Sequence, residues 1–560
     1  MNSNTMDYVK HLWRYLLVLA PLTGLLSCNP TEKKQAPVKH LIVIGFDGMS
    51  PDGIRKAHTP VLDSLMAQGS ATLHARSVLP SSSSPNWAAM IMGAGPEHHG
   101  ITSNAWEKNN HILPPNVATA NGTFPTIFDL FAHQRIDAHV GAIYDWDGFG
   151  RLFDKATVDF DIDGDHEDKT TQAAVDYIKE HRPHFTFIHL DHVDHAGHAQ
   201  GHGSPEYYAA VAKADSLAGA ILQATKEAGI FDETLFLLSA DHGGLGTGHG
   251  GETLAEMEIP FILYGPGIKK GYTIQNTVMQ YDNAATVAYA FGLEMPQAWI
   301  GRPVLEAFEG QPNAQPTYTK PERFEAPIVK PDQGHFANPG GLFLNEEAVL
   351  ELYNPNQKGE IRFTLNGENP TEKSPLYTQP LPIKEPAVVR AGIFVDKQLV
   401  STLAQADFRF VSPEGPNGLR YSTYPLESLT VLPNFDALTP SSEGKTYEFS
   451  SNILKSAGEG EAHIAIRFQG EIQIDTPGLY TFYTHSDDGS KLYINDRLIV
   501  DNDGDHGVRE KGGALALETG RHRIRVDYFN GGGGYHLDVK FKGPEYVKQT
   551  LPAHLLYPKN

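Results

Sequence analysis

The stretch from residue 235 to 251, LFLLSADHGGLGTGHGG, constrains the fold of this chain more than any other. It begins as an apolar run that is too short for a typical helix and that suits a buried parallel strand. Asp241 and His242 follow at the end of the run, and His249 comes after several glycines. Carboxylates and imidazoles are common metal ligands, and glycine lets the backbone turn them inward without steric cost. The stretch therefore indicates a strand with a metal site at its carboxyl end; the alternative is a solvated Gly/His loop.

Two further apolar runs end in a similar way. Residues 40–46 are closed by Asp47, and residues 185–190 are followed by a segment rich in Asp and His. Another strand is expected at residues 140–144, and helical spacing is found at residues 59–69, 171–180 and 209–227. This alternation predicts a doubly wound α/β fold, with a mostly parallel sheet and helices on both faces. In such sheets the ligand site lies beyond the carboxyl ends of the strands.

The segment after the second run, HLDHVDHAGHAQGHG, contains two Asp-His pairs with the same spacing. These are Asp191 with His195 and Asp194 with His198, and spacing alone does not choose between them. The surplus histidines are expected to lie outside the ligand set: His192, His195 and His202.

A run of serines indicates a nucleophile at the start of a helix. Residues 79–104 read LPSSSSPNWAAMIMGAGPEHHGITSN, with the serines directly before Pro85 and Asn86. The backbone N–H groups and the dipole at a helix N-terminus favour an anionic phosphate or alkoxide. The alternative for such a serine is an N-cap and nothing more.

These pieces together resemble a known family. IVIGFDG, TPVLDSL, SSPN…GAGPEHHGI, DHAGH and SADHGG are similar to motifs of the alkaline phosphatase superfamily, closest to its type I phosphodiesterase/nucleotide pyrophosphatase branch. The resemblance covers about residues 40–310. The family's second segment reads Asp-x-x-Gly-His, which selects Asp194 and His198 because Gly197 precedes only that histidine.

The resemblance implies an alkaline-phosphatase-like fold with two zinc ions, although other divalent ions are an alternative. One ion is expected on Asp194, His198 and His249. The other is expected on Asp47, Asp241 and His242, with the nucleophile bridging toward both ions. The family nucleophile is usually a threonine two residues before Pro-Asn, and this position is Ser83 here. The family asparagine that binds a phosphoryl oxygen falls on Asn104.

This ligand set suits a two-metal site for phosphoryl transfer. The expected reaction is an in-line attack that forms a phosphoseryl intermediate. Because serines 81–84 are consecutive, Ser82 and Ser84 stay open as nucleophiles. Sulfatases of the superfamily need Cys/Ser-x-Pro-Ser-Arg, whereas Asn86 and Trp87 follow the proline here, which disfavours that activity. His249 comes seven residues after His242, whereas nucleotide pyrophosphatases place the last histidine far downstream. Nucleotide specificity is therefore not carried over from the resemblance.

The substrate class depends on charge. Residues 83–104 contain no Lys or Arg, which favours phosphodiesters over monoesters, because monoesterases use such a cation to bind the extra negative charge. A cation from a distant loop would instead favour a phosphomonoesterase. A third alternative is a glycan-binding lipoprotein with an idle hydrolase domain.

The N-terminus resembles a bacterial lipoprotein signal. Basic residues precede a short apolar run at residues 16–26, and Ser27 and Cys28 follow this run directly. Cys28 is the only cysteine, and we expect it to carry a lipid anchor on an exported, periplasm-facing or surface-exposed protein. The net charge of -22, without a basic stripe, argues against nucleic acid as a partner.

Beyond a Pro-rich stretch the pattern becomes all-β. Residues 360–383 alternate around an Asn-Gly turn and resemble the C-terminal sandwich of chitobiases and β-hexosaminidases. GLYTFYTHSDDGSKLYINDRLIVDNDGDHG and GRHRIRVDYFNGGGG resemble a PA14 β-barrel, which implies calcium and glycan binding at Asp487 and Asp488; a structural turn is the alternative. The expected divisions are a signal at 1–27, a tether at 28–37, the catalytic domain at 38–310, a linker at 311–334, the sandwich at 335–412 and the PA14 domain at 413–560.

Overall fold

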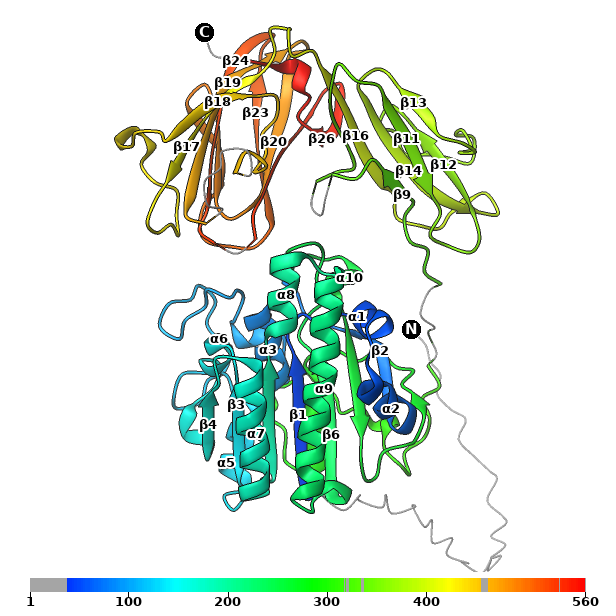
Figure 1. Cartoon of the computed structure of the whole chain (residues 1–560), viewed down its shortest axis with the longest axis vertical. Helices are drawn as coiled ribbons and strands as arrows, with labels where there is room; N and C mark the ends of the chain where they lie inside the picture. Colours follow the sequence, from blue (N-terminus) through cyan, green and yellow to red (C-terminus); the bar gives the residue numbers. More distant parts are fainter. Residues whose placement is uncertain are drawn as a thin grey trace, which may run out of the picture. The chain divides into compact units, whose positions relative to one another are not determined.

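The structure is a computed structural model that describes residues 38–316, 318, 322–333, 337–454, 462–532 and 534–558. The expected signal, the tether and Cys28 lie outside the described residues. Within the described residues, an α/β domain is followed in sequence by all-β sheets (Figure 1). The expected fold class is therefore confirmed. Among the described helices, none combines the length and the apolar character needed to cross a membrane.

An eight-stranded sheet forms the centre of the α/β domain, in the order β4-β3-β5-β1-β6-β7-β2-β8. Strand β7 pairs antiparallel with β6 and with β2, while the other pairs of this sheet are parallel. The strands are β1 His40–Phe46, β2 Ser70–Arg76, β3 Val140–Tyr144, β4 Phe160–Asp163, β5 Phe185–Leu190, β6 Thr234–Ala240, β7 Glu258–Tyr264 and β8 Tyr272–Thr273.

Helices cover both faces of this sheet. In Figure 1, α7 and α9 cross the face toward the viewer, where they pack against each other. Helices α3, α5 and α11 pack together as a second group. The α-helices are α1 Pro51–Lys56, α2 Pro60–Gln68, α3 Ser83–Met92, α4 Pro96–His99, α5 Ile127–Gln134, α6 Asp147–Gly150, α7 Glu167–His181, α8 His192–Gln200, α9 Pro205–Glu227, α10 Leu254–Met257 and α11 Asp282–Phe291. The short 3-10 helices of this domain are Lys155–Thr157, Phe231–Glu233 and Leu305–Ala307.

The register of the central strands sets the position of the site. Phe46 at the end of β1 lies opposite Leu190 at the end of β5 and Ala240 at the end of β6. The three strands therefore end level, and the polar residues that follow each of them emerge at one edge of the sheet. Strands β5 and β6 are buried throughout, and β1 is buried after His40, as expected for parallel strands covered on both faces.

Helix α9 begins four residues before the apolar spacing suggests. Ser204 caps it by accepting a hydrogen bond from the Tyr207 N–H, and Pro205 occupies the first helical position. Both features stabilise a helix start independently of its apolar face.

The first all-β module consists of two sheets with a shared apolar core. One sheet has the order β10-β16-β14-β12 with β15 on β14, and the other has the order β13-β11-β9. Residues 328–330 of the expected linker are a strand, β9, because they pair with residues 351–353 of β11. The strands are β9 Ile328–Lys330, β10 Gly340–Leu344, β11 Ala348–Tyr353, β12 Glu360–Thr364, β13 Leu381–Ile383, β14 Ala387–Val395, β15 Gln398–Leu399 and β16 Ala404–Val411.

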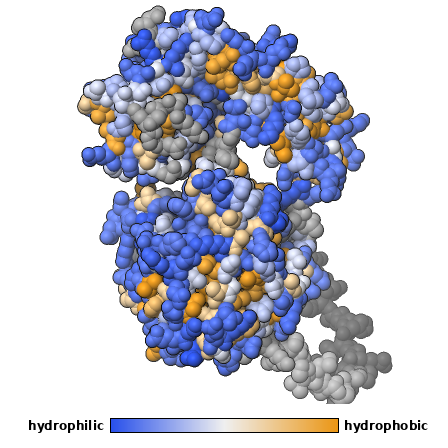
Figure 2. All heavy atoms as spheres, in the orientation of Figure 1, coloured by the Kyte–Doolittle hydropathy of each residue, from blue (hydrophilic) through white to orange (hydrophobic). Residues whose placement is uncertain are grey.

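The second all-β module has a seven-stranded and a four-stranded sheet around a core of its own. Its strands are β17 Leu419–Pro425, β18 Ser442–Thr446, β19 Ile464–Ile474, β20 Gly478–Asp487, β21 Ser490–Ile494, β22 Arg497–Asn502, β23 Arg509–Leu517, β24 Gly520–Asn530, β25 His536–Gly543, β26 Tyr546–Thr550 and β27 Leu556–Tyr557, with short 3-10 helices at Phe435–Ala437 and Ala553–Leu555. On the face drawn in Figure 2, hydrophobic side chains are scattered among a hydrophilic majority, in keeping with the net charge of -22.

Candidate active site

Three buried aspartates meet beyond the level strand ends. Asp47 directly follows β1, Asp241 directly follows β6, and Asp194 lies in the first turn of α8, which follows β5. Their exposed fractions are 1%, 0% and 6%. Gly48 lets the chain turn here, because its φ is +67° and a Cβ at this position would lie 2.6 Å from Asp194 Oδ1.

His242 faces two of these carboxylates. Its Nε2 atom lies 3.4 Å from Asp47 Oδ1 and 3.1 Å from Asp241 Oδ2. Its Nδ1 atom lies 2.7 Å from the Gly243 carbonyl oxygen. A proton on Nδ1 that donates to this carbonyl leaves the Nε2 lone pair directed at the carboxylates, which is the orientation of a metal ligand.

His198 and His249 face the third carboxylate. The Nε2 atoms of His198 and His249 lie 3.1 and 3.8 Å from Asp194 Oδ2, and 3.2 Å from each other. Each Nδ1 atom is again placed on a backbone carbonyl, that of Thr247 at 2.8 Å for His198 and that of Ser81 at 3.2 Å for His249. The three imidazoles thus share one arrangement, with Nδ1 toward a carbonyl and Nε2 toward a carboxylate.

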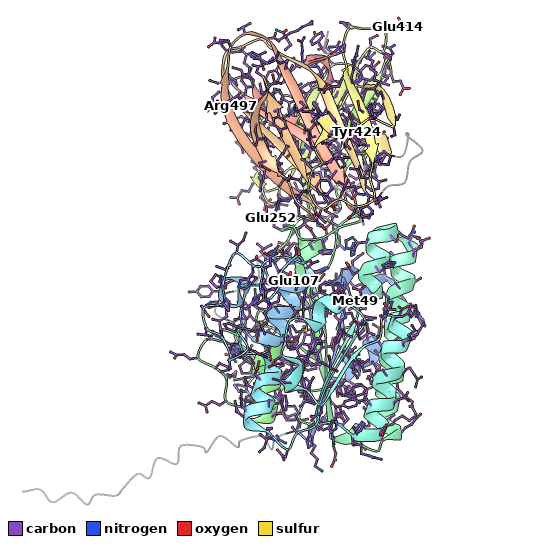
Figure 3. The ribbon with its side chains drawn as sticks, turned by 90° about the vertical axis from the view of Figure 1, so that its left-hand side faces the viewer. Met49, Glu107, Glu252, Glu414, Tyr424 and Arg497 are labelled. Atoms are coloured by element: carbon purple, nitrogen blue, oxygen red, sulfur yellow. The ribbon has the colours of Figure 1, made fainter. Side chains whose placement is uncertain are left out.

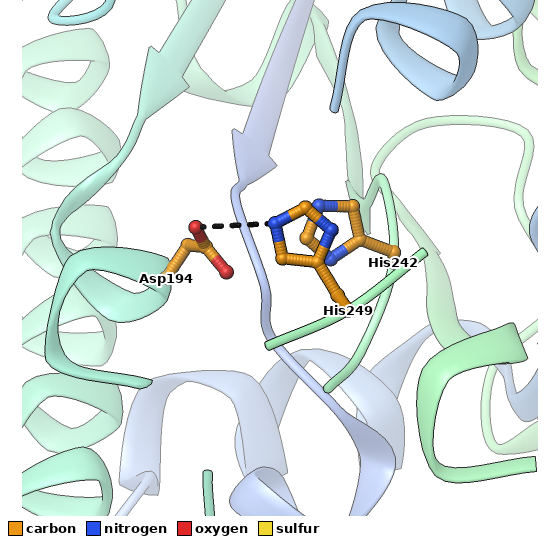
Figure 4. Close-up of side chains that lie close together, drawn as sticks. All are labelled: Asp194, His242 and His249. Atoms are coloured by element: carbon orange, nitrogen blue, oxygen red, sulfur yellow. Dashed lines mark ion pairs between the residues drawn. The ribbon is translucent and has the colours of Figure 1, made fainter. Parts of the chain in front are cut away.

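The two groups of side chains are adjacent. The rings of His242 and His249 stack with centroids 3.8 Å apart, and Figure 4 shows both rings opposite Asp194. Ligand atoms of Asp47, Asp241 and His242 lie within 4.8 Å of one another, as do those of Asp194, His242 and His249. The structure therefore brings together all six residues predicted as ligands: Asp47, Asp194, His198, Asp241, His242 and His249.

The donor atoms fit divalent cations. Within the described part of the chain, Asp47 Oδ1, Asp194 Oδ1 and Asp241 Oδ2 are buried and have no hydrogen-bond partner. Unpaired buried carboxylate oxygens are costly unless a cation compensates them. Three carboxylates and three imidazoles without a thiolate match the ligand preferences of zinc and similar divalent ions.

The pKa shifts within the cluster also favour a site for divalent cations. Burial, followed by the negative charges of Asp47 and Asp194, raises the pKa of Asp241 well above its ordinary value. Burial, followed by the neighbouring His242, lowers the pKa of His249 well below its ordinary value, whereas the negative charge of Asp194 raises the pKa of His198 to about 10. Buried carboxylates that repel one another form an environment that divalent cations stabilise.

Ser83 is the serine that reaches this cluster. It is the first residue of α3, it is 5% exposed, and its Oγ lies 3.2 Å from His242 Nε2. Ser82 is the N-cap residue, and the Ser81 hydroxyl donates to the Gly251 carbonyl oxygen at 2.6 Å. The Ser84 N–H donates to Asn104 Oδ1 at 2.8 Å. Among the four consecutive serines, the geometry thus favours Ser83, and it places Asn104 beside the same helix end.

The choice between the two Asp-His pairs also has a structural basis. Helix α8 begins at His192, so that Asp191 is its N-cap residue, while Asp194 and His198 lie one turn apart on the face toward the sheet edge. His195 is exposed. The geometry therefore agrees with Asp194 and His198.

Two buried residues contact the Asp47 carboxylate, and the sequence did not single them out as functional. His189 is fully buried, with Nε2 3.3 Å from Asp47 Oδ2 and Nδ1 3.2 Å from Asp145 Oδ1. Trp87 Nε1 donates to Asp47 Oδ2 at 2.9 Å. Although burial alone would lower the pKa of His189, hydrogen bonds to Asp145 and Asp47 raise it to about 10. His189 lies within an apolar strand pattern. This pattern predicts that the residue is buried, but it does not predict its polar partners.

Of the surplus histidines, His202 lies against the site. Its Nε2 is 3.6 Å from Asp194 Oδ1, and its ring fills the space beside Gly197, where a Cβ would come within 2.4 Å of it. The glycine of the DHAGH motif, which lies within α8, is therefore required by its packing against the His202 ring. His192 instead places Nε2 3.2 Å from the Ala210 carbonyl oxygen.

The aspartate pair in the second all-β module has a different environment. Asp488 Oδ1 accepts from the His506 N–H at 2.9 Å, and its Oδ2 accepts from the Gly531 N–H at 2.8 Å. Burial, followed by the charge of Asp488, raises the pKa of Asp487 well above its ordinary value. Both aspartates are thus buried at the end of β20, and their binding of calcium or glycan stays a prediction.

Comparisons with known proteins support the resemblance. Residues 41–256 match the type I phosphodiesterase / nucleotide pyrophosphatase family, residues 338–404 match the chitobiase/beta-hexosaminidase C-terminal domain, and residues 439–552 match the PA14 domain. The expected resemblance to the type I phosphodiesterase/nucleotide pyrophosphatase branch is thus matched by a family model over residues 41–256 of the α/β domain, which is less than half of the chain.

Curated relatives match part of the chain. GPI ethanolamine phosphate transferase 1 of Saccharomyces cerevisiae is 24% identical over 49% of this chain and 34% of its own length. Ectonucleotide pyrophosphatase/phosphodiesterase family member 1 of Rattus norvegicus is 25% identical over 39% of this chain and 26% of its own length. The chain thus spans about a third or less of these two relatives.

Solved structures with some similarity are distant. Murine ectonucleotide pyrophosphatase/phosphodiesterase 5 is 15% identical with a TM-score of 0.40, covering 46% of this chain and 96% of its own. A mutant of the alkaline phosphatase PafA is 12% identical with a TM-score of 0.40, covering 49% of this chain and 99% of its own.

Proposed function

We propose that the α/β domain hydrolyses phosphate esters, with two divalent ions held by the six clustered ligands and with Ser83 as the nucleophile. The observation that carries this proposal is the Ser83 hydroxyl at the N-terminus of α3, 3.2 Å from His242 Nε2. A hydroxyl in this position can attack a phosphorus atom that is held beside the carboxylate cluster. Zinc is the ion that the resemblance and the ligand types favour.

When bound, the two ions would lower the pKa of the serine hydroxyl and neutralise charge on the phosphoryl and leaving oxygens. The remaining roles belong to the chain itself. Ser83 Oγ forms a new P–O bond while the ester P–O bond to the leaving group breaks, and this gives phosphoserine. Ser83 loses its proton to solvent, and the leaving alkoxide takes one up. Water then cleaves the phosphoserine and restores the hydroxyl.

The end of α3 stabilises the phosphoryl group during these steps. The helix dipole favours negative charge at this position. Asn104 is fixed beside it, because its Oδ1 accepts from the Ser84 N–H at 2.8 Å. This leaves its Nδ2 to donate to a phosphoryl oxygen.

The test is to assay the purified full chain, supplied with zinc, on aryl phosphate monoesters, aryl phosphate diesters and an aryl sulfate. Acid quenching during turnover, followed by mass spectrometry, would locate the covalent phosphate. We expect phosphate on Ser83 and no aryl sulfatase activity. Phosphate on Ser82 or Ser84, or sulfate hydrolysis without phosphate hydrolysis, would contradict the proposal.

Export and anchoring belong to the same proposal. The basic N-terminus, the apolar run and Cys28 support a lipoprotein whose catalytic domain faces an extracytoplasmic compartment. The match to the PA14 domain supports glycan-linked substrates or a glycan contact that holds the enzyme near them. Replacing Cys28 with alanine should release the protein from washed membranes without affecting its fold.

A further inference from the structure

A cation from a distant part of the chain reaches the end of α3. Arg151, which directly follows α6, places Nη2 3.4 Å from Ser84 Oγ. The same nitrogen donates to the backbone oxygen of Asn104. The guanidinium therefore contacts the residue that follows the proposed nucleophile and the asparagine proposed to bind phosphate.

Arg151 is held in this position from two sides. Its Nη1 lies 2.7 Å from Glu107 Oε1, and its guanidinium carbon lies 5.9 Å from the centroid of the Trp146 ring. Its Nε is buried without a hydrogen-bond partner in the described residues, and its side chain is 27% exposed. Figure 3 places Glu107 at the same edge of the α/β domain as Met49, which lies two residues after Asp47.

The positive charge of Arg151 at the start of α3 affects whether the site favours phosphate monoesters or diesters. A phosphate monoester carries up to two negative charges, whereas a diester carries one and presents a neutral ester oxygen in place of an oxyanion. Residues 83–104 contain no Lys or Arg, so nothing in that stretch compensates the second charge. Arg151 brings a guanidinium to the same helix end, and charge-assisted hydrogen bonds from Arg to phosphate are strong and directional.

The hydrogen-bond capacity of Arg151 is not exhausted. A guanidinium has five N–H donors, and the hydrogen-bond partners of Arg151 among the described residues are Glu107, Asn104 and Ser84. Glu107 is itself exposed and pairs with Nη1, whereas Ser84 lies near Nη2. An exposed ion pair of this kind orients the guanidinium but neutralises only a modest part of its charge.

We infer that Arg151 is a specificity-determining residue that binds the additional oxyanion of a phosphate monoester, so that the site takes monoesters in preference to diesters with the same leaving group. This inference rests on the proposed function and narrows its substrate class. In the reaction, the phosphoryl group passes from the leaving oxygen to Ser83 and then to water. The products are an alcohol and inorganic phosphate, and Arg151 exchanges no proton.

The test compares two esters with one leaving group, p-nitrophenyl phosphate and methyl p-nitrophenyl phosphate. For the zinc-supplied full chain we expect the higher kcat/KM on the monoester. Arg151→Ala should lower kcat/KM for the monoester by about 10- to 100-fold, the range for loss of a charged hydrogen bond. The diester should change by no more than about threefold, so the ratio of the two values falls. Arg151→Lys should be intermediate, because the charge stays and the planar fork is lost.

Arg135→Ala is the matched control. Arg135 is also part of the α/β domain, pairs with Asp137 at 3.6 Å, and has a side chain 28% exposed. Its replacement should leave the ratio of monoester to diester activity unchanged. A wild-type preference for the diester, or an equal loss on both esters in Arg151→Ala, would overturn the inference, because equal losses indicate that Arg151 only fixes the loop that carries Asn104.

A binding measurement separates this inference from the proposed function. Isothermal titration of the zinc-loaded protein with inorganic phosphate needs no turnover. We expect Arg151→Ala to weaken phosphate binding by about tenfold or more with two zinc ions retained. Phosphate binding that does not change in Arg151→Ala, or that is absent in the wild type, would overturn the inference. Absence of hydrolysis alone, with Arg151-dependent phosphate binding, would overturn only the proposed function.

Discussion

Two clusters of buried aspartates in the described part of the chain, one in the α/β domain and one in the second all-β module, are neutralised in different ways. The strand-end cluster of Asp47, Asp194 and Asp241 faces imidazole nitrogens and keeps carboxylate oxygens without hydrogen-bond partners. Both oxygens of Asp488 in the second all-β module instead accept backbone N–H groups. The first group requires cations for its charge to be stable, whereas the second is partly satisfied by the chain itself. Burial alone therefore does not distinguish the two clusters, whereas the partners of each carboxylate oxygen do.

The largest effect should follow from removing a carboxylate of the strand-end cluster. Asp241→Asn should lose at least about a thousandfold in activity, because ligand loss removes several kcal/mol of transition-state stabilisation. Elemental analysis should show less than two zinc equivalents per chain. Two full equivalents in this variant would show that Asp241 is not a ligand.

The next largest effect should come from Ser83→Ala. Activity should fall by roughly a hundredfold or more, because the oriented nucleophile is lost while the protein ligands of both ions remain. Ser83→Thr should keep much of the activity, and Ser82→Ala is the control that should cost far less. Zinc content measured in parallel should stay at two equivalents. Near-normal activity in Ser83→Ala would exclude it as the nucleophile.

A smaller effect is expected from replacing a residue that contacts a proposed ligand but is not itself a ligand. His189→Asn should weaken zinc affinity by about 10- to 100-fold, because His189 and Asp145 orient the Asp47 carboxylate. A competitive chelator titration would measure the affinity, and Asp145→Asn should behave similarly. His192→Asn is the control, since His192 contacts a backbone oxygen away from the ligands. Unchanged affinity in His189→Asn would assign it a packing role alone.

The smallest effect concerns the aspartate pair of the second all-β module. Burial raises the pKa of Asp488 to about 7, although its backbone N–H partners act in the opposite direction. A raised carboxyl pKa means that the folded state binds more protons, so stability should fall as pH rises from about 4 to about 7. Asp488→Asn should weaken this dependence, measured as Tm against pH. If calcium binds the pair, it should raise the Tm of the wild type at pH 7 but not that of the variant.

The strand ends could be predicted because parallel strands bring their carboxyl ends to one edge, whatever their separation in sequence. Asp47, Asp241 and His242 follow apolar runs directly, so a pattern of runs and polar residues locates them. The choice between Asp191 and Asp194 was different, because it depends on where α8 begins, and the spacing of both Asp-His pairs is the same. The resemblance supplied this choice, and periodicity could not.

Other features could not be predicted because their partners are remote in sequence. Arg151 contacts Ser84 and Asn104, which are remote from it in the sequence. The residues that flank Arg151 in the sequence do not indicate these contacts. Strand β9 lies in a Pro-rich stretch with the composition of a linker, and it is a strand because β11 presents an edge to residues 328–330. Sequence patterns report burial and local conformation, while pairings of this kind arise only from tertiary packing.

The level ends of β1, β5 and β6 have a consequence for how the sheet is aligned during folding. Strands that are apolar on both faces specify their register weakly, since a slip of one residue still buries apolar side chains. Such a slip would move a strand end by about 3.3 Å. It would break the hydrogen bonds from Gly48 N–H to Asp241 Oδ1 and from Asp47 N–H to the Leu190 carbonyl oxygen. These hydrogen bonds at the strand ends thus also fix the register, and insertions of one residue within these strands should be tolerated less than their uniform hydrophobicity suggests.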